Sequence, residues 1–137
     1  MQDVLAYNIG VKIESNGKHY MRPMLTKNMQ IPCEETREFF TSTDYQEKLE
    51  IQILQGQNQY SEDNLQLGIL EVYLTEDVAM RKAGKNCIIV TFNVDVNHRL
   101  TVKAVDKKSG KSKIMQQDFR GEGMNPQEKD LAKYRVA

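Results

Sequence analysis

Apolar and polar residues alternate along much of the chain, and turn-forming residues separate the alternating segments. The clearest example is VTFNVDVNHRLTVKAVDKKSGK, residues 90–111. A period of two places successive side chains on opposite faces of a strand, so this stretch predicts two strands joined by a turn at Asn97–Arg99. A further turn follows at DKKSGK. The apolar side chains expected to face inward are Val90, Phe92, Val94 and Val96 on the first strand and Leu100, Val102 and Ala104 on the second.

The first half of the chain shows the same pattern. Asn16-Gly17 is the dipeptide best suited to a turn that requires positive φ, and it lies between two strand-like segments, which predicts a hairpin. In KLEIQILQG, the side chains of Leu49, Ile51 and Ile53 share one face opposite polar residues. This segment predicts a half-buried strand that ends at Gly56.

Two intervening segments are less regular. The polar stretch around Pro32 is typical of a connector, and we expect it to enter a short strand at Phe39–Phe40. A turn at Asp63–Asn64 precedes a strand expected from Leu65 to Leu74.

Only the C-terminal segment, MNPQEKDLAKYR, predicts a helix, with Asn125 as its N-cap and Pro126 in the first helical position. Many short strands separated by turns, followed by one terminal helix, favour a mainly β fold, an antiparallel sandwich. A chain of 137 residues can close one such core without disulfides or a metal ion.

Charge and hydropathy narrow the classes of partner. Nineteen Lys and Arg residues balance nineteen Asp and Glu residues, so no overall field attracts nucleic acid or an anionic membrane. No apolar run approaches the roughly 20 residues that cross a bilayer, and the N-terminus lacks the parts of a signal peptide. We therefore expect no nucleic-acid partner and no membrane partner. We expect a cytoplasmic location, and the endoplasmic reticulum or another organelle remains open because a removed targeting signal would leave no trace.

The chain offers little to catalysis. The spacing of Cys33 and Cys87 fits neither a disulfide framework nor a metal site, so both are expected to be free thiols. His19 and His98 have no second ligand at metal-binding distance and are interpreted as surface or turn residues. No nucleophile elbow and no paired carboxylates occur. We expect no enzymatic activity, no cofactor and no metal in this segment.

A resemblance to a known family adds to this interpretation. TKNMQIP, FFTSTDYQ, IQILQGQNQYSEDNLQLG and the hairpin at residues 90–111 occur in this order. Together they resemble the substrate-binding β-domain of the 70-kilodalton heat-shock chaperones, the DnaK-type family, from about Asp3 to Asn125. DVLAYNIG is similar to the family's first strand, and GMNPQE is similar to the start of its lid helix. The resemblance implies an eight-stranded antiparallel β-sandwich at residues 1–122 and the start of a truncated helical lid at residues 123–137.

The implied function is that of a chaperone domain that holds extended hydrophobic segments of unfolded polypeptides by non-covalent contacts. The hairpin at residues 90–111 would be scaffold on the side away from the peptide. Leu49 would stand at the centre of a pocket for one aliphatic side chain. The residues that the resemblance assigns to the peptide groove are Val11, Ile13, Tyr20, Phe39, Phe40, Ser42, Gln46, Leu49 and Ile51.

The resemblance also implies contacts outside the groove. Asp44 and Arg81 would form the ion pair that latches the lid, while Asp3, Lys27 and Asn28 would face the ATPase domain. ATP and Mg²⁺ would belong to that separate N-terminal domain. The implied partners of the full-length protein are unfolded peptides, its own ATPase domain, J-domain co-chaperones and exchange factors.

Several alternatives stay open at the level of sequence. By alternation alone, the apolar residues of KLEIQILQG are core residues of any sandwich. Leu49 replaces a smaller Val of the family, and the first loop, IESNGKHY, is longer, so Glu14 or Ser15 could form the second side of the arch. These departures also fit a divergent member that acts as an exchange-factor or adaptor module with weakened client binding. Finally, the tail KDLAKYRVA could occupy the groove of its own chain or of a second copy, which would give a dimer.

Overall fold

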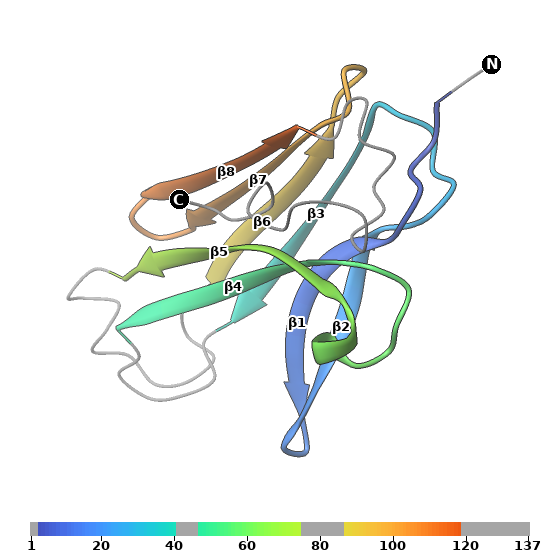
Figure 1. Ribbon diagram of the computed structural model, residues 1–137. Coiled ribbons are helices and arrows are strands. Elements are labelled where there is room, and N and C mark those ends of the chain that lie inside the picture. Colours follow the sequence, from blue (N-terminus) through green and yellow to red (C-terminus); the bar gives the residue numbers. More distant parts are fainter. Residues whose placement is uncertain (1–2, 41–46, 75–86, 119–137) are drawn as a thin grey trace.

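A computed structural model describes residues 3–40, 47–74 and 87–118 of the chain (Figure 1). These residues form eight strands and one short 3-10 helix. The helix expected within residues 124–135, the lid start at residues 123–137 and the tail lie outside the described residues, as do Ser42, Asp44, Gln46 and Arg81.

The strands form two four-stranded antiparallel sheets packed as a sandwich, as the sequence predicted. One sheet has the order β2-β1-β4-β5 and the other β3-β6-β7-β8. The first sheet consists of β1 (Ile9–Ser15), β2 (Lys18–Leu25), β4 (Lys48–Gln55) and β5 (Leu65–Tyr73). The second consists of β3 (Cys33–Phe40), β6 (Cys87–Val94), β7 (Arg99–Asp106) and β8 (Ser112–Asp118). The 3-10 helix η1 (Ser61–Asp63) precedes β5.

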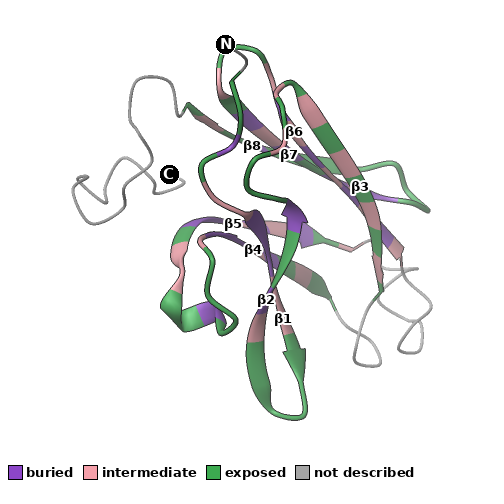
Figure 2. Cartoon of the chain, turned by 90° about the vertical axis from the view of Figure 1, so that its right-hand side faces the viewer, coloured by how far each residue is buried: buried purple, intermediate pink, exposed green. Residues whose placement is uncertain are grey.

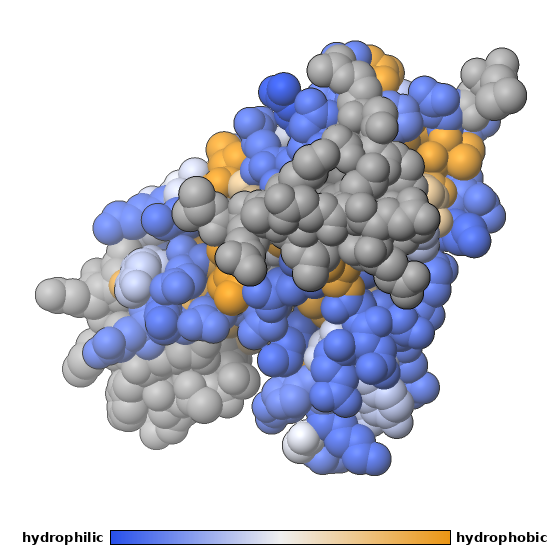
Figure 3. Space-filling model, in the orientation of Figure 1, coloured by the Kyte–Doolittle hydropathy of each residue, from blue (hydrophilic) through white to orange (hydrophobic). Residues whose placement is uncertain are grey.

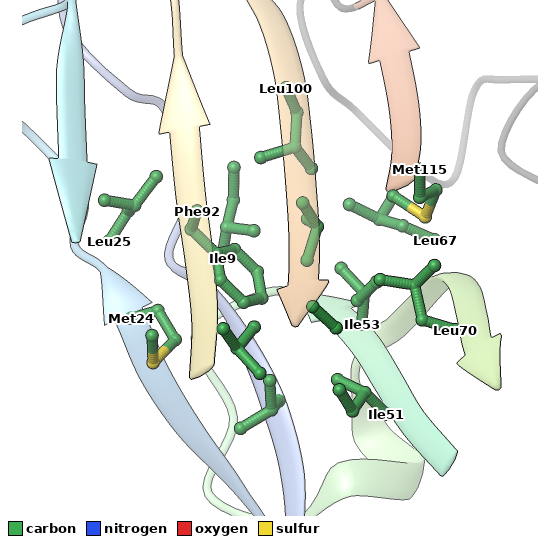
Figure 4. Close-up of a cluster of buried hydrophobic side chains, with 14 of the residues drawn as sticks. Ile9, Met24, Leu25, Ile51, Ile53, Leu67, Leu70, Phe92, Leu100 and Met115 are labelled. Carbon is green, nitrogen blue, oxygen red and sulfur yellow. The ribbon is translucent and has the colours of Figure 1, made fainter. Parts of the chain in front are cut away.

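The inner faces of the two sheets meet in a single apolar core (Figure 4). On β6 and β7 every second residue is buried, because the strand period turns alternate side chains inward. Phe92 is the largest side chain that is fully shielded from solvent. The side chains labelled around it in Figure 4 are Ile9, Met24, Leu25, Ile51, Ile53, Leu67, Leu70, Leu100 and Met115.

Two turns show how local sequence fixes the strand connections. Asn16 and Gly17 have φ values of 52° and 77°, which confirms the predicted turn between β1 and β2. The turn between β6 and β7 has no glycine, and His98 adopts a φ of 62° there. The side chain of Asp95 supports this conformation, since its Oδ1 accepts the backbone N–H groups of Asn97 at 2.9 Å and Arg99 at 3.0 Å.

The structure corrects two sequence predictions. The strand expected at Phe39–Phe40 begins at Cys33, because β3 is an outer strand whose side chains need not be apolar. Val96, expected to face inward, is 64% exposed. The strand ladder ends at Val94, and the Asp95 turn takes the following residues out of the sheet.

The surface is largely hydrophilic in the view of Figure 3, with small hydrophobic areas between the polar side chains. No helix among the described residues is long and apolar enough to cross a membrane.

Candidate functional site

One pocket gathers most of the residues expected to form a peptide groove. It has a volume of about 410 Å³ and lies where the end of β3 and the start of β4 approach β1. Figures 1 and 2 show the end of β3 near the beginning of β4 from two directions. The lining residues are Val11, Lys12, Ile13, Glu14, Phe39, Phe40, Leu49, Glu50 and Ile51.

The pocket is an extension of the core towards one open end of the sandwich. Val11 and Ile51 are 2% and 5% exposed and belong to the core cluster, so they form a fixed floor. Ile13, Phe39 and Leu49 are half-buried and pack against the same cluster. Ile53, two residues beyond Ile51 on the same face of β4, is fully buried. The apolar face of β4 therefore lines the pocket at the start of the strand and packs in the core further along it.

Antiparallel pairing holds these walls in place. Val11 of β1 pairs with Ile53 of β4, which fixes the register between two of the three strands that line the pocket. Phe39 and Phe40 are held by their pairing with the start of β6. Phe40 is 55% exposed and lies at the outer edge of the pocket.

Charged side chains form the rim. Lys12, Glu14 and Glu50 line the pocket, and the sequence assignment missed Lys12 and Glu50. Lys12 and Glu50 each lie next in sequence to an apolar residue that was assigned to the groove. Because side chains alternate along a strand, the apolar neighbour points inward and the charged residue lies at the edge of the pocket. Lys48 Nζ lies 3.3 Å from Glu50 and 3.5 Å from Glu71. The hydrogen bond to Glu50 raises the pKa of Lys48, and the negative charge of Glu71 adds to this effect.

Tyr20 does not line this pocket, although it pairs with Ile13, which does. Its ring stacks on that of Tyr60 with a centroid separation of 5.4 Å, and the two residues form a backbone bridge. Ser42 and Gln46, the other assigned groove residues, and the latch pair Asp44 and Arg81 lie outside the described residues.

The residues expected to face another domain lie together at the opposite end of the sandwich, where the N-terminal segment runs beside the β2–β3 connection (Figure 1). The backbone carbonyl of Asp3 accepts the N–H of Ile31 at 3.1 Å. Asn28, with a φ of 75°, donates its N–H to the carbonyl of Leu5 at 2.9 Å, and Lys27 donates its N–H to the Asn8 side chain at 2.8 Å.

The histidines and cysteines belong to no metal-binding group among the described residues. Among the described residues, no group of three or more His, Cys, Asp or Glu side chains is placed to hold a metal ion. His98 lies in the β6–β7 turn, where its Nε2 is 3.1 Å from Asp3 Oδ2.

Both cysteines are free. Burial raises the pKa of the Cys33 thiol, and burial together with a hydrogen bond from Cys87 Sγ to Glu38 raises the pKa of Cys87 to about 11. Neither thiol is activated as a nucleophile.

Comparison with known proteins identifies relatives of this sandwich. The model of the Hsp70 protein family matches residues 1–134. The chaperone protein DnaK of Deinococcus deserti is 34% identical over 109 residues, which cover 80% of this chain and 16% of that protein. The DnaK of Cyanophora paradoxa is 34% identical over 111 residues, or 81% of this chain and 17% of its own length. The chaperone protein HscA of Buchnera aphidicola is 31% identical over 114 residues, or 83% of this chain and 18% of its own length.

This chain thus spans less than a fifth of the length of these relatives. The family match covers both sheets and every residue that lines the pocket. This chain belongs to the Hsp70 protein family.

Proposed function

We propose that this chain is a peptide-binding domain of an Hsp70-type chaperone and that it holds extended hydrophobic segments of unfolded polypeptides. The observation that carries the proposal is the pocket at the open end of the sandwich, which has an apolar floor from β1 and β4 and an aromatic wall from β3. Its relatives are named chaperone proteins, which supports the same role.

The shape and chemistry of the pocket suit one aliphatic side chain of an extended peptide. Val11, Ile51 and Leu49 offer aliphatic surface, and Phe39 adds a flat aromatic wall. Burying an aliphatic side chain there contributes about 1.5–3 kcal/mol. The charged rim of Lys12, Glu14 and Glu50 stays in water and can contact the polar backbone or the flanking side chains of the peptide. Binding is non-covalent and requires no cofactor in this segment.

In the full-length protein we propose coupling to a separate N-terminal ATPase domain that holds ATP and Mg²⁺. The end of the sandwich that carries Asp3, Lys27 and Asn28 would face that domain, because it lies opposite the pocket. J-domain co-chaperones and exchange factors would act on the full-length protein.

The proposal is tested by fluorescence anisotropy with a labelled, extended peptide that has Leu at its centre. A matched peptide with Asn at that position is the control, because it keeps the size and removes the apolar side chain. We expect the Leu peptide to bind at least about tenfold more tightly, the factor that corresponds to about 1.4 kcal/mol. Equal or absent binding of the two peptides by the folded chain would contradict the proposal and favour the adaptor role.

A further inference from the structure

A second pocket lies on the flank of the sandwich where the outer strands of the two sheets, β2 and β3, come together. Its volume is about 550 Å³, and it shares no lining residue with the pocket described above. It is lined by Arg22 from β2, by Thr36, Arg37 and Glu38 from β3, and by Ile89 from β6. Two arginines from different sheets thus line one concave surface.

Neither arginine forms an ion pair with another described residue. Within residues 3–40, 47–74 and 87–118, the ion pairs involve Lys48, His98 and Lys107, and neither Arg22 nor Arg37. Arg22 is exposed, whereas Arg37 is half-buried, and its Nε is shielded from solvent without a hydrogen-bond acceptor. A shielded guanidinium nitrogen without an acceptor is unfavourable, and the negative charge of a ligand in the pocket would stabilise this guanidinium group without direct contact to Nε.

Glu38, the acidic residue that lines this second pocket, already has partners outside it. Glu38 follows Arg37 on β3, so its side chain leaves the opposite face of the strand. Its Oε2 accepts a hydrogen bond from Cys87 Sγ at 3.0 Å and lies 3.8 Å from Lys107 Nζ. These contacts partner the negative charge of Glu38, so the free charge in the pocket is positive.

The backbone edge of β3 beside the pocket is open to pairing. β2 and β3 are outer strands of their sheets, and no backbone hydrogen bond joins one to the other. The outer edge of β2 is already occupied at Tyr20 and Met21, where Met21 donates its N–H to the carbonyl of Gln59 at 2.9 Å, so β3 offers the open edge. Figure 2 shows β3 at the border of its sheet, with exposed and half-buried residues in alternation. An outer strand presents a row of N–H and C=O groups to which an extended peptide can add, and side chains beside that row then select its sequence.

We propose that this flank is a second binding site, which takes an extended peptide segment with acidic side chains. The segment pairs with the free edge of β3, and its carboxylates bind the guanidinium groups of Arg22 and Arg37. Arginine suits this task because its planar fork of donors matches a carboxylate with two parallel hydrogen bonds. The site goes beyond the proposed function, since it selects charge where the first pocket selects an aliphatic side chain.

The test uses a labelled peptide of roughly eight residues, the length of an average strand, in which Glu alternates with Val or Thr. The control peptide carries Gln in place of each Glu. We expect the Glu peptide to bind at least about tenfold more tightly, and its affinity to fall as salt is raised, because exposed charges are screened. Equal affinity of the two peptides would overturn the proposal.

Protein variants locate the site. The double variant Arg22→Gln, Arg37→Gln should bind the Glu peptide roughly tenfold or more weakly, and its affinity for the Leu-centred peptide should be unchanged. Arg99→Gln is the matched control, because Arg99 is an exposed arginine at the start of β7 and does not line the pocket. An equal loss in Arg99→Gln, or no loss in the folded double variant, would refute the assignment.

Two further measurements keep the result interpretable if the double variant does not fold. Arg22→Glu alters only an exposed side chain, so this variant should fold. It should bind a peptide with Lys in place of each Glu more tightly than it binds the Glu peptide. Unlabelled Leu-centred peptide should not displace the Glu peptide. Displacement would place the Glu peptide in the first pocket, and complete displacement by inorganic phosphate at constant ionic strength would indicate a simple anion site. Either result would overturn the proposal of a separate peptide site.

Discussion

Substitution of Leu49 by Phe tests the first pocket most directly. Leu49 is half-buried and lines the pocket of about 410 Å³ beside Ile51, so a larger ring would occupy the space that the proposal gives to the peptide. An aliphatic peptide side chain gains about 1.5–3 kcal/mol on full burial. Loss of that burial corresponds to roughly a tenfold to hundredfold weaker complex, since each 1.4 kcal/mol is about tenfold.

The substitution should leave the sandwich folded. Leu49 lies at the pocket end of β4, where the ring can extend into open space, so the cost in stability should stay below the roughly 1–3 kcal/mol of overpacking a closed core. Circular dichroism and urea unfolding measure this cost, and fluorescence anisotropy with the Leu-centred peptide measures affinity.

Ile53→Val is the matched control on the same face of the same strand. Ile53 is fully buried and does not line the pocket, so this variant should lose about 0.5–1.5 kcal/mol of stability and keep its peptide affinity. The reasoning is refuted if folded Leu49→Phe binds the peptide as tightly as the unaltered chain, or if Ile53→Val weakens binding equally.

The remaining predictions concern three positions in the scaffold. Phe92→Ala should reduce the free energy of unfolding by about 3–5 kcal/mol in urea titrations, because Phe92 is fully buried between the sheets; a loss below 1 kcal/mol would contradict its central packing. Gly10→Ala should destabilise the chain by more than about 1 kcal/mol in the same assay, since the added Cβ would overlap the backbone carbonyl of Arg22; unchanged stability would show that the strands separate freely. Cys87 should react slowly with iodoacetamide at pH 8, and Glu38→Gln should accelerate the reaction by removing a carboxylate that stabilises the protonated thiol. Because the folded state raises the pKa of this thiol from 9.0 to about 11, its contribution to stability should be complete below pH 9 and lost as pH rises towards 11.

The sequence alone determined the local features of this protein. The turn at Asn16-Gly17 is encoded by residues that tolerate positive φ, and the inward faces of β6 and β7 are encoded by a period of two. Both depend on interactions within a few residues, so the pattern of the chain was sufficient to predict them. Where the same alternation continued to Val96, the prediction was wrong, because the strand ended first at the turn in which the Asp95 side chain accepts the N–H of Asn97.

The assignment of a site depended on more than periodicity. Alternation described Leu49 and Ile51 as core residues, and the structure shows that Ile51 is both a core residue and the floor of a pocket. The resemblance to the family assigned the groove residues, and the structure brings six of them together around that pocket. It places Tyr20 against Tyr60 instead, a contact between residues forty positions apart that no local pattern encodes.

Only the tertiary structure decided which strands that are not consecutive in the chain became neighbours. β1 pairs with β4, and β3 pairs with β6, across long stretches of intervening chain. The polar sequence of β3 became a strand because it lies at the border of a sheet, where one edge and one face stay open. The meeting of Arg22 and Arg37 follows from the same arrangement, because the two arginines belong to different sheets and share a pocket only once the sandwich has closed. Local sequence sets the direction of each side chain along its own strand, whereas proximity between strands depends on burial of the common core.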